Sequence, residues 1–269
     1  MTTWHWVQRQ GQSYLICDLL RDWSHGFFTR AFWPQPPKEL TPTLSPGARA
    51  YRVKQVHGNR ILSPQHLDMT SAAAQPNSEP EPHFWPEADG LLSDGNQQAL
   101  WVCTADCNPV LVGDLRTGQV AAIHAGWRGT ALKIVSITVE KMLALGSRHH
   151  DLVVAIGPAI AGEVYQVSTQ VGLEVGQTIY DVDSLADVSD SDLMEALLAM
   201  DQPPLLPDAN PERVKLDVRR VNVLQLERLG LSSAQIAVAP HCTFQESQHF
   251  FSYRRTREKK VQWSGIVSF

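Results

Sequence analysis

Short, continuous apolar runs mark the middle of the chain. Residues 99–104, 109–113 and 119–124 consist mostly of apolar side chains, which predicts three buried strands. Residues 114–118 separate the last two runs and combine Asp with Gly, a composition typical of tight turns. These two strands are therefore predicted to pair as an antiparallel hairpin. Residues 152–158 and 235–240 predict two further strands.

A helical spacing follows the hairpin. From Thr130 onward apolar residues recur every three or four positions, and Gly146 is placed to end the predicted helix. Residues 214–229 repeat this spacing before a glycine, so we predict a second helix there. The aromatic run 250–253 is interpreted as a strand.

Strands and helices in this irregular order predict an α+β fold rather than a regular alternation of parallel strands with helices. We expect residues 1–269 to form a single domain in which a mixed sheet is flanked by helices. Residues 66–87 contain a run rich in Pro, Ala and Ser, and are predicted to form a mobile loop. A second irregular stretch is expected at 181–210.

Composition and charge exclude several function classes. Apolar residues make up 43% of the chain and charged residues 19%, which indicates a globular rather than a disordered protein. A net charge of −5 gives no reason to expect nucleic acid or a membrane as a partner. Neither a signal peptide nor a membrane span is expected from the apolar pattern. The four cysteines are too few for a disulfide framework, so we expect a cytoplasmic protein with reduced thiols.

Three segments place histidine or cysteine close to the ends of predicted strands, and they are centred on His57, Cys107 and His124. Because Cys107 precedes one strand of the predicted hairpin and His124 ends the other, both residues should lie at the same end of the sheet. A Cys–His pair can bind a metal or act as a nucleophile with its base. Three protein ligands with an open fourth position would form a catalytic zinc site. Taken one at a time, a histidine is more often structural or solvated than a ligand and a cysteine is more often part of the core, so spacing alone leaves the metal site and the structural reading at even odds.

The segment after His124 is suited to bind an anion. Gly126 and Gly129 would let the backbone approach a ligand closely, and the helix predicted from Thr130 would present unpaired N–H groups. Arg128 can add a charged donor. We therefore predict that this loop holds phosphate close to the metal. The structural alternative is a sharp turn with Arg128 in solvent.

Several nearby polar residues have more than one plausible role. Asp106 could orient a ligand, carry a proton or cap a turn, and Cys242 could line the site or have a structural role. Cys103 is expected to be a buried thiol, and the helix residues Asn222 and Gln225 are expected to pack rather than catalyse.

A set of motifs in one order gives the chain a family resemblance. Between Gln55 and Arg255 it contains Gln-Val-His-Gly, Ala-Asp-Cys-Asn-Pro, His-Ala-Gly-Trp-Arg-Gly, Gly-Pro-Ala-Ile, Leu-Asp-Val and Phe-Phe-Ser-Tyr-Arg-Arg. This set resembles the YfiH family, also called the polyphenol oxidase laccase-domain family. One departure is Gln166, at a position where that family usually has Glu.

The resemblance implies a single α+β domain similar to the catalytic domain of a deamidating bacterial toxin. It implies a catalytic zinc ion held by His57, Cys107 and His124, with Arg254, Arg255 or both in contact with substrate. It also implies phosphorolysis of purine nucleosides (adenosine, inosine, guanosine and methylthioadenosine), with adenosine deamination beside it. The expected small-molecule partners are therefore a purine nucleoside and phosphate.

Three alternatives stay open. Copper-dependent oxidation of polyphenols is the older label of the same family, but one cysteine and two histidines are too few to bind several coppers. A metal-free amide hydrolase would use Cys107 as nucleophile and His124 as base. A binding protein with a structural zinc would need a fourth protein ligand.

Overall fold

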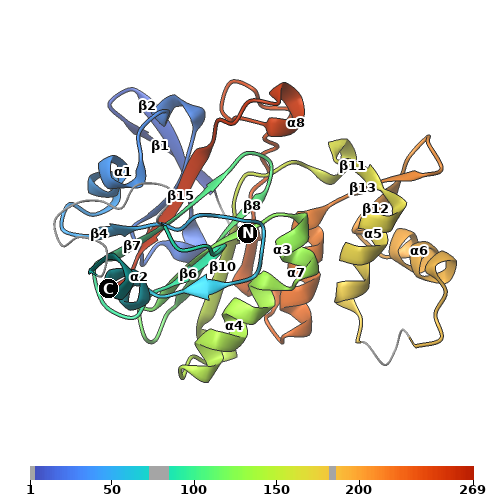
Figure 1. Ribbon diagram of the computed structural model, residues 1–269, viewed down its shortest axis with the longest axis horizontal. Coiled ribbons are helices and arrows are strands. Elements are labelled where there is room, and N and C mark those ends of the chain that lie inside the picture. The colour runs from blue at the N-terminus through green and yellow to red at the C-terminus, as the bar shows by residue number, and fades with distance from the viewer. Residues whose placement is uncertain (1–3, 73–84, 182–185) are drawn as a thin grey trace.

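Three β-sheets organise the chain in the computed structural model, which describes residues 4–72, 85–181 and 186–269 (Figure 1). The first sheet has the order β1 (Trp4–Arg9), β2 (Gln12–Cys17), β3 (His25–Phe28), β15 (Gln262–Val267), β7 (Gln98–Thr104) and β4 (Arg49–Tyr51). The second has the order β14 (Ile236–Val238), β10 (Leu152–Ile156), β8 (Asn108–Asp114), β9 (Val120–Ala125), β6 (Gly90–Leu92) and β5 (Ile61–Leu62). The third is small and has the order β11 (Gln166–Ser168), β13 (Arg213–Leu216) and β12 (Leu205–Pro207).

Helices flank these sheets. The helices of the described residues are α1 (Pro37–Leu44), α2 (Pro64–Ala72), α3 (Trp127–Ala131), α4 (Ile134–Ala144), α5 (Thr169–Gly176), α6 (Asp190–Ala199), α7 (Val218–Arg228) and α8 (Tyr253–Thr256). Parallel and antiparallel pairs occur in both large sheets, so the predicted α+β fold with mixed sheets flanked by helices is confirmed.

The two large sheets pack face to face. Leu15 and Leu100 of the first sheet share one buried core with Leu111 of the second. The other face of the second sheet packs on α4 and α7, and α1 covers the other face of the first sheet. The small third sheet has its own core with α5 and α6, and Figure 1 shows this part at one side of the main body.

The hairpin of β8 and β9 is buried along its whole length. One of its faces meets the first sheet and the other meets α4 and α7, which explains why its sequence is apolar without alternation. Pro109 pairs with His124 and Asn108 pairs with Ala125. The predicted hairpin is therefore confirmed, and Cys107 and His124 lie at the same end of it.

The helix predicted from Thr130 to Gly146 is in fact two helices. The first, α3, already begins at Trp127, and Lys133 adopts a left-handed backbone conformation (φ 55°) before α4 begins. Gly146 (φ 103°) follows α4, as predicted. The apolar spacing continued across the break and therefore did not reveal it.

The prediction of one helix over 214–229 is wrong at its start. Val214 and Leu216 are buried in β13, whose residues pair with β11 and β12. Asp217 then caps α7, because its carboxylate accepts a hydrogen bond from the backbone N–H of Arg220 (3.1 Å). Val214 and Val218 lie four positions apart, a spacing that fits a strand followed by a helix as well as one long helix.

Three further expectations need correction. Residues 250–253 do not form a strand, because Ser252 caps the short helix α8 instead. The irregular stretch 181–210 contains α6, whose N-cap is Ser189. The mobile loop predicted at 66–87 is wrong over 66–72, which belong to α2, and residues 73–84 lie outside the described part of the chain.

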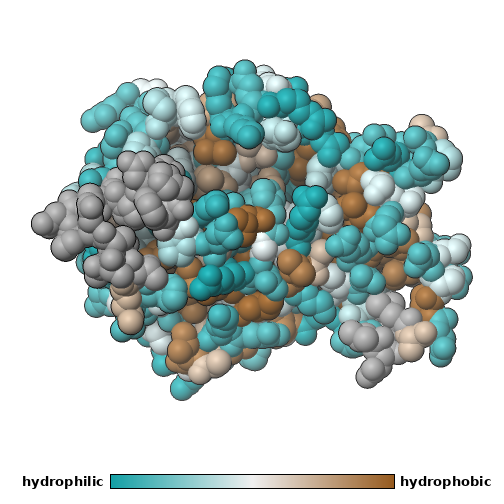
Figure 2. All heavy atoms as spheres, in the orientation of Figure 1, coloured by the Kyte–Doolittle hydropathy of each residue, from teal (hydrophilic) through white to brown (hydrophobic). Residues whose placement is uncertain are grey.

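The surface of the face drawn in Figure 2 is mostly hydrophilic, and hydrophobic side chains reach it in small separate groups. Among the described residues, no helix combines the length and the apolar character that crossing a bilayer requires.

Candidate metal centre

His57, Cys107 and His124 converge at one end of the central hairpin. Their candidate ligand atoms all lie within 4.8 Å of one another. The two imidazole rings have centroids 4.8 Å apart and are nearly perpendicular, at 81°. Ligand atoms around a tetrahedral zinc ion are about 3.5 Å apart, so a small contraction would bring all three onto one ion. His124 is buried, Cys107 half-buried and His57 exposed, so the group opens to solvent on the His57 side.

Asp89 connects the two histidines from behind. Its carboxylate is fully buried, and Oδ1 lies 2.8 Å from Nδ1 of His124, which leaves Nε2 of that ring for a metal. The same carboxylate accepts hydrogen bonds from the backbone N–H groups of Val56, His57 and Gly58 at 3.1, 2.9 and 2.7 Å. A carboxylate behind a metal-binding histidine fixes its tautomer and orientation.

The backbone at His57 has a conformation that few residues other than glycine adopt. Its φ is 62°, in the left-handed region. The three hydrogen bonds to Asp89 hold it there, and Gln55 anchors the same segment to β7. The amide of Gln55 donates to the carbonyl oxygen of Cys103 and accepts from its N–H, both at 2.8 Å. This explains why glutamine precedes the histidine in the Gln-Val-His-Gly motif.

Gly126 leaves room for the cysteine. A Cβ atom at this position would lie 2.8 Å from Sγ of Cys107 and 3.4 Å from Cδ2 of His57. Any larger side chain would therefore push into the ligand group, so glycine is required here for packing.

Charges in the group favour a thiolate beside an imidazolium. Burial acts to raise the pKa of Cys107, but the charge and hydrogen bonds of His124 and His57 lower that pKa to about 6. Burial acts to lower the pKa of His124, but the negative charge of Cys107 and the bond to Asp89 raise it to about 9. Burial likewise acts to raise the pKa of Asp89, and its hydrogen bonds, first that from His124, hold it below the usual value. A deprotonated cysteine is the form that binds metal.

Asp106 joins the Cys107 segment to the C-terminal part of the chain. Its side chain accepts hydrogen bonds from the hydroxyl of Thr243 (2.8 Å) and from the backbone N–H of Arg254 (2.7 Å). Its φ of 91° is unusual for a residue other than glycine. These contacts make Asp106 a structural link between the Cys107 segment and the segments of Thr243 and Arg254.

The three arginines predicted to bind substrate have different surroundings. The guanidinium of Arg255 donates to the carbonyl oxygens of Thr243, Phe244 and Phe250, so it holds this segment together. That of Arg254 lies over the ring of Tyr165, 4.7 Å from its centroid.

Arg128 is exposed and lies over the ring of Trp127. Arg128 and Gly129 lie inside α3 rather than in a loop before the helix, which corrects the predicted geometry. The helix start lies at Trp127, three residues earlier than predicted, and the phosphate role of this segment stays a prediction.

A pocket of about 380 Å³ lies where α3, β11 and α8 meet. Its lining residues are Trp127, Tyr165, Gln166, Val167, Ser168, Val171, Arg213, Arg254 and Arg257. Burial raises the pKa of Tyr165 to about 12, and the negative charge of Cys107 adds to this, so the pocket lies within electrostatic reach of the ligand group.

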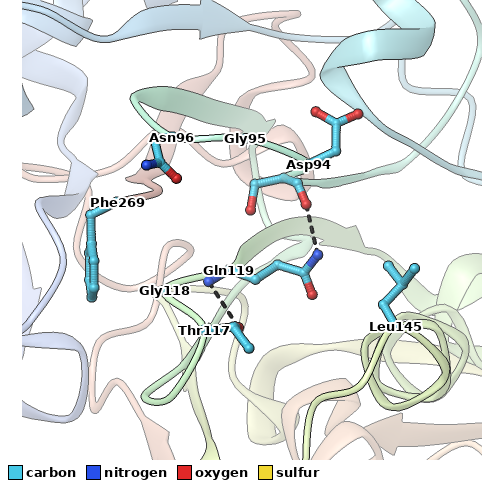
Figure 3. A pocket seen from close by; sticks show the side chains of 9 residues that line it. Asp94, Gly95, Asn96, Thr117, Gly118, Gln119, Leu145 and Phe269 are labelled. Carbon is cyan, nitrogen blue, oxygen red and sulfur yellow. Dashed lines mark hydrogen bonds between the residues drawn. The ribbon is translucent and has the colours of Figure 1, made fainter.

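A second pocket, of about 250 Å³, lies at the other end of β9 (Figure 3). Figure 3 shows Gln119 between Phe269 on one side and Leu145 on the other. The amide of Gln119 donates to the carbonyl oxygen of Ser93, and the carboxylate of Asp94 accepts a hydrogen bond from the amide of Gln98. Because the side chains of Gln119 and Asp94 are already paired and the three candidate metal ligands are at the far end of the strand, this pocket is not the candidate site.

The remaining predicted residues pack. Cys242 is buried, and its sulfur accepts a hydrogen bond from the N–H of Ala161 (3.3 Å). Asn222 and Gln225 are buried and bond to Thr130, which confirms that they pack. Sequence reasoning missed Asp89, because only the pairing of β6 with β9 brings it behind His124.

His57, Cys107 and His124 form a possible metal site with three candidate ligands. Sites with three protein ligands are typical of catalytic rather than structural zinc. Comparison with known proteins narrows this class. A family model described as multi-copper polyphenol oxidoreductase laccase matches residues 39–267, and the chain belongs to that family.

The name of a similar protein differs from the description of the family model. A purine nucleoside phosphorylase of Synechocystis sp. is 54% identical over 266 residues, which is 99% of this chain and 97% of the relative. The crystal structure of YlmD from Geobacillus stearothermophilus is similar with a TM-score of 0.72 at 25% identity, covering 97% of this chain and 98% of that one. YfiH of Bacillus licheniformis, described as hypothetical, has the same TM-score and coverage at 24% identity. The predicted family is confirmed, whereas the likeness to a toxin domain stays a prediction.

Proposed function

We propose that this chain is a zinc-dependent purine nucleoside phosphorylase that acts on adenosine, inosine, guanosine and methylthioadenosine. The observation that carries the proposal is the open group of His57, Cys107 and His124 beside an arginine-lined pocket. The full-length identity to a protein named purine nucleoside phosphorylase supports it. In the proposed reaction a phosphate oxygen bonds to C1′ of the ribose while the bond from C1′ to the purine nitrogen breaks. The products are the purine, which takes up a proton, and the sugar 1-phosphate, which is ribose 1-phosphate, or 5-methylthioribose 1-phosphate when methylthioadenosine is the substrate.

The donor set fits zinc. One thiolate and two imidazoles are ligands that zinc prefers, and the lowered pKa of Cys107 supplies the thiolate at neutral pH. Zinc at this site would act as a Lewis acid at its open position. The chain contributes orientation and charge around it: Asp89 fixes the ring of His124, and Arg254 places a positive charge near Tyr165.

The purine would bind against aromatic side chains. Trp127 and Tyr165 line the pocket beside the ligand group, and purine rings stack favourably on aromatic faces. In this proposal Arg254 contacts the substrate directly. Arg128 supports it from α3, and Arg255 supports it from α8 through its bonds to the preceding segment. A cytoplasmic location also stays a prediction.

Copper-dependent phenol oxidation is the activity named in the description of the family model. Among the described residues, one group of histidine, cysteine and acidic side chains meets the spacing of a metal site, and it offers three ligands. Oxygen reduction to water by a multi-copper enzyme requires further copper ligands of this kind. We therefore favour the phosphorylase.

A second candidate reaction is hydrolysis. Cys107, His124 and Asp89 have the order of a nucleophile, a base and an orienting carboxylate, which favours a metal-free amide hydrolase. Deamination of adenosine at the zinc site would also be hydrolytic, with water in place of phosphate. Removal of zinc distinguishes the metal-free cysteine hydrolase from the zinc-dependent deaminase, because only the cysteine hydrolase would stay active.

The proposal is tested by incubating zinc-loaded protein with the four nucleosides, with and without phosphate, and identifying products by mass. We expect free purine and the sugar 1-phosphate, which is 5-methylthioribose 1-phosphate for methylthioadenosine and ribose 1-phosphate for the others, only when phosphate is present. Cys107→Ala and His124→Ala should lose zinc and activity together. Full activity in protein shown by elemental analysis to contain no metal would refute the zinc role. Inosine formed from adenosine would add the deaminase activity.

A further inference from the structure

Three arginines from two distant segments of the chain line one pocket. Arg213 lies in β13, Arg254 in α8, and Arg257 directly after that helix, and Trp127 and Tyr165 complete the wall. Figure 1 shows α8, the small sheet and α3 around the region where this sheet adjoins the main body. The pocket of about 380 Å³ is within the size range of small-molecule sites and exceeds what one inorganic phosphate fills.

The charges of these arginines are not neutralised by ion pairs. Over residues 4–72, 85–181 and 186–269, none of the three makes an ion pair with a carboxylate. Arg254 donates to the carbonyl oxygen of Gln166 (2.8 Å), and Arg213 and Arg257 are exposed. Asp208 is a nearby acid, and the positive charges of Lys215 and Arg213 help to lower its pKa. Its two carboxylate oxygens accept hydrogen bonds from the side-chain amide of Gln166, at 3.0 and 3.1 Å. The pocket therefore keeps a net positive charge.

This pocket also adjoins the ligand group. Arg254 is tied through its backbone N–H to Asp106, the residue before Cys107. Trp127 follows Gly126, which packs directly on the sulfur of Cys107. An anion held by the arginines would consequently lie beside the metal centre, with an aromatic wall next to it.

We propose that Arg213, Arg254 and Arg257 form a phosphate subsite of the metal centre. The ligand is a phosphate group, either inorganic phosphate or the 5′-phosphate of a nucleotide, because planar guanidinium groups bind its oxygens in pairs. The inference rests on the proposed function for the reaction that follows binding. It assigns the anion to this pocket rather than to the start of α3, which is only five residues long.

The test compares three variants of the zinc-loaded full chain. Arg213→Gln with Arg257→Gln removes two charges from the pocket, and Arg213→Lys with Arg257→Lys keeps them as point charges. Arg148→Gln is the matched control, since Arg148 is exposed between α4 and β10 and outside the pocket. Initial rates are measured with inosine while inorganic phosphate is varied, and with adenosine 5′-monophosphate as the alternative substrate. Calorimetry measures equilibrium binding of inorganic phosphate and of the nucleotide without any reaction.

In the glutamine pair we expect the KM for one of the two phosphate sources to rise about tenfold, because two charged contacts are lost and solvent weakens each of them at these exposed arginines. The KM for inosine should stay unchanged, the lysine pair should recover part of the loss, and the control should match wild type. A rise for inorganic phosphate identifies the co-substrate, and a rise for the nucleotide identifies a 5′-phosphate. Unchanged values for both overturn the subsite. If wild type cleaves no nucleoside, the proposed function fails, and calorimetry still decides: about tenfold weaker binding in the glutamine pair supports the subsite, and equal binding overturns it.

Discussion

Replacement of Asp89 by Asn should weaken zinc binding without unfolding the protein. The substitution keeps the shape of the side chain but removes its charge and one acceptor oxygen, while four donors around it still need acceptors. Hydrogen bonds to charged groups contribute about 1.5–3 kcal/mol each. Loss of an outer partner of a metal ligand typically weakens metal binding about 10–100-fold, or about 1.4–2.7 kcal/mol. We therefore expect the Kd for zinc to rise within that range.

The assay is competition for zinc with a chromophoric chelator of known affinity, with circular dichroism as the measure of folding. Asp114→Asn is the matched control. Asp114 is also fully buried and accepts the N–H groups of Arg116 and Thr117 at 2.8 and 3.1 Å, but it lies at the other end of β8. Wild-type zinc affinity in the Asp89 variant would refute the reasoning. Equal loss in both variants would show a general effect on stability.

Three other outcomes are expected. In metal-free protein, alkylation of Cys107 by iodoacetamide should rise with a midpoint near pH 6, while Cys103, whose pKa burial raises to about 11, stays unreactive; a midpoint near pH 9 would contradict the thiolate assignment. The stability contributed by that thiolate is present at higher pH and lost as pH falls through about 6, whereas the contribution of His124 is lost as pH rises through about 9. Acid denaturation of metal-free protein should therefore begin near pH 6, and a Cys107→Ala variant without this step is the check. Gly126→Ala should reduce zinc occupancy measured by elemental analysis, because its Cβ would press on the sulfur of Cys107; full occupancy would show that the loop can move aside.

The sequence was sufficient to predict the α+β class and the central hairpin, because β8 and β9 are apolar throughout and are joined by a tight turn. The pairing of that hairpin also explains why Cys107 and His124 come together. His57 was a candidate from its own motif, but no strand pairing predicted its place beside the other two, since its left-handed backbone depends on hydrogen bonds to Asp89, 32 positions away in sequence.

Other parts could not be predicted from local pattern. The strand at the start of 214–229 depends on partners in β11 and β12 that no local spacing records. Arg213 and Arg257 were not predicted to be functional, because isolated arginines are common on protein surfaces. Only the fold brings Arg213 into one pocket with Arg254 and Arg257. Conversely, Arg255 is prominent in a specific motif, yet its guanidinium is engaged by backbone carbonyls.

The central claim is that phosphate, not water, attacks the nucleoside at this site. It is tested most directly by letting the zinc-loaded protein cleave inosine in ¹⁸O-labelled water with unlabelled phosphate, and measuring the mass of the sugar product. We predict ribose 1-phosphate without ¹⁸O at the anomeric carbon, and no cleavage when phosphate is omitted. Free ribose carrying ¹⁸O, formed at the same rate with or without phosphate, would contradict the account and establish a hydrolase.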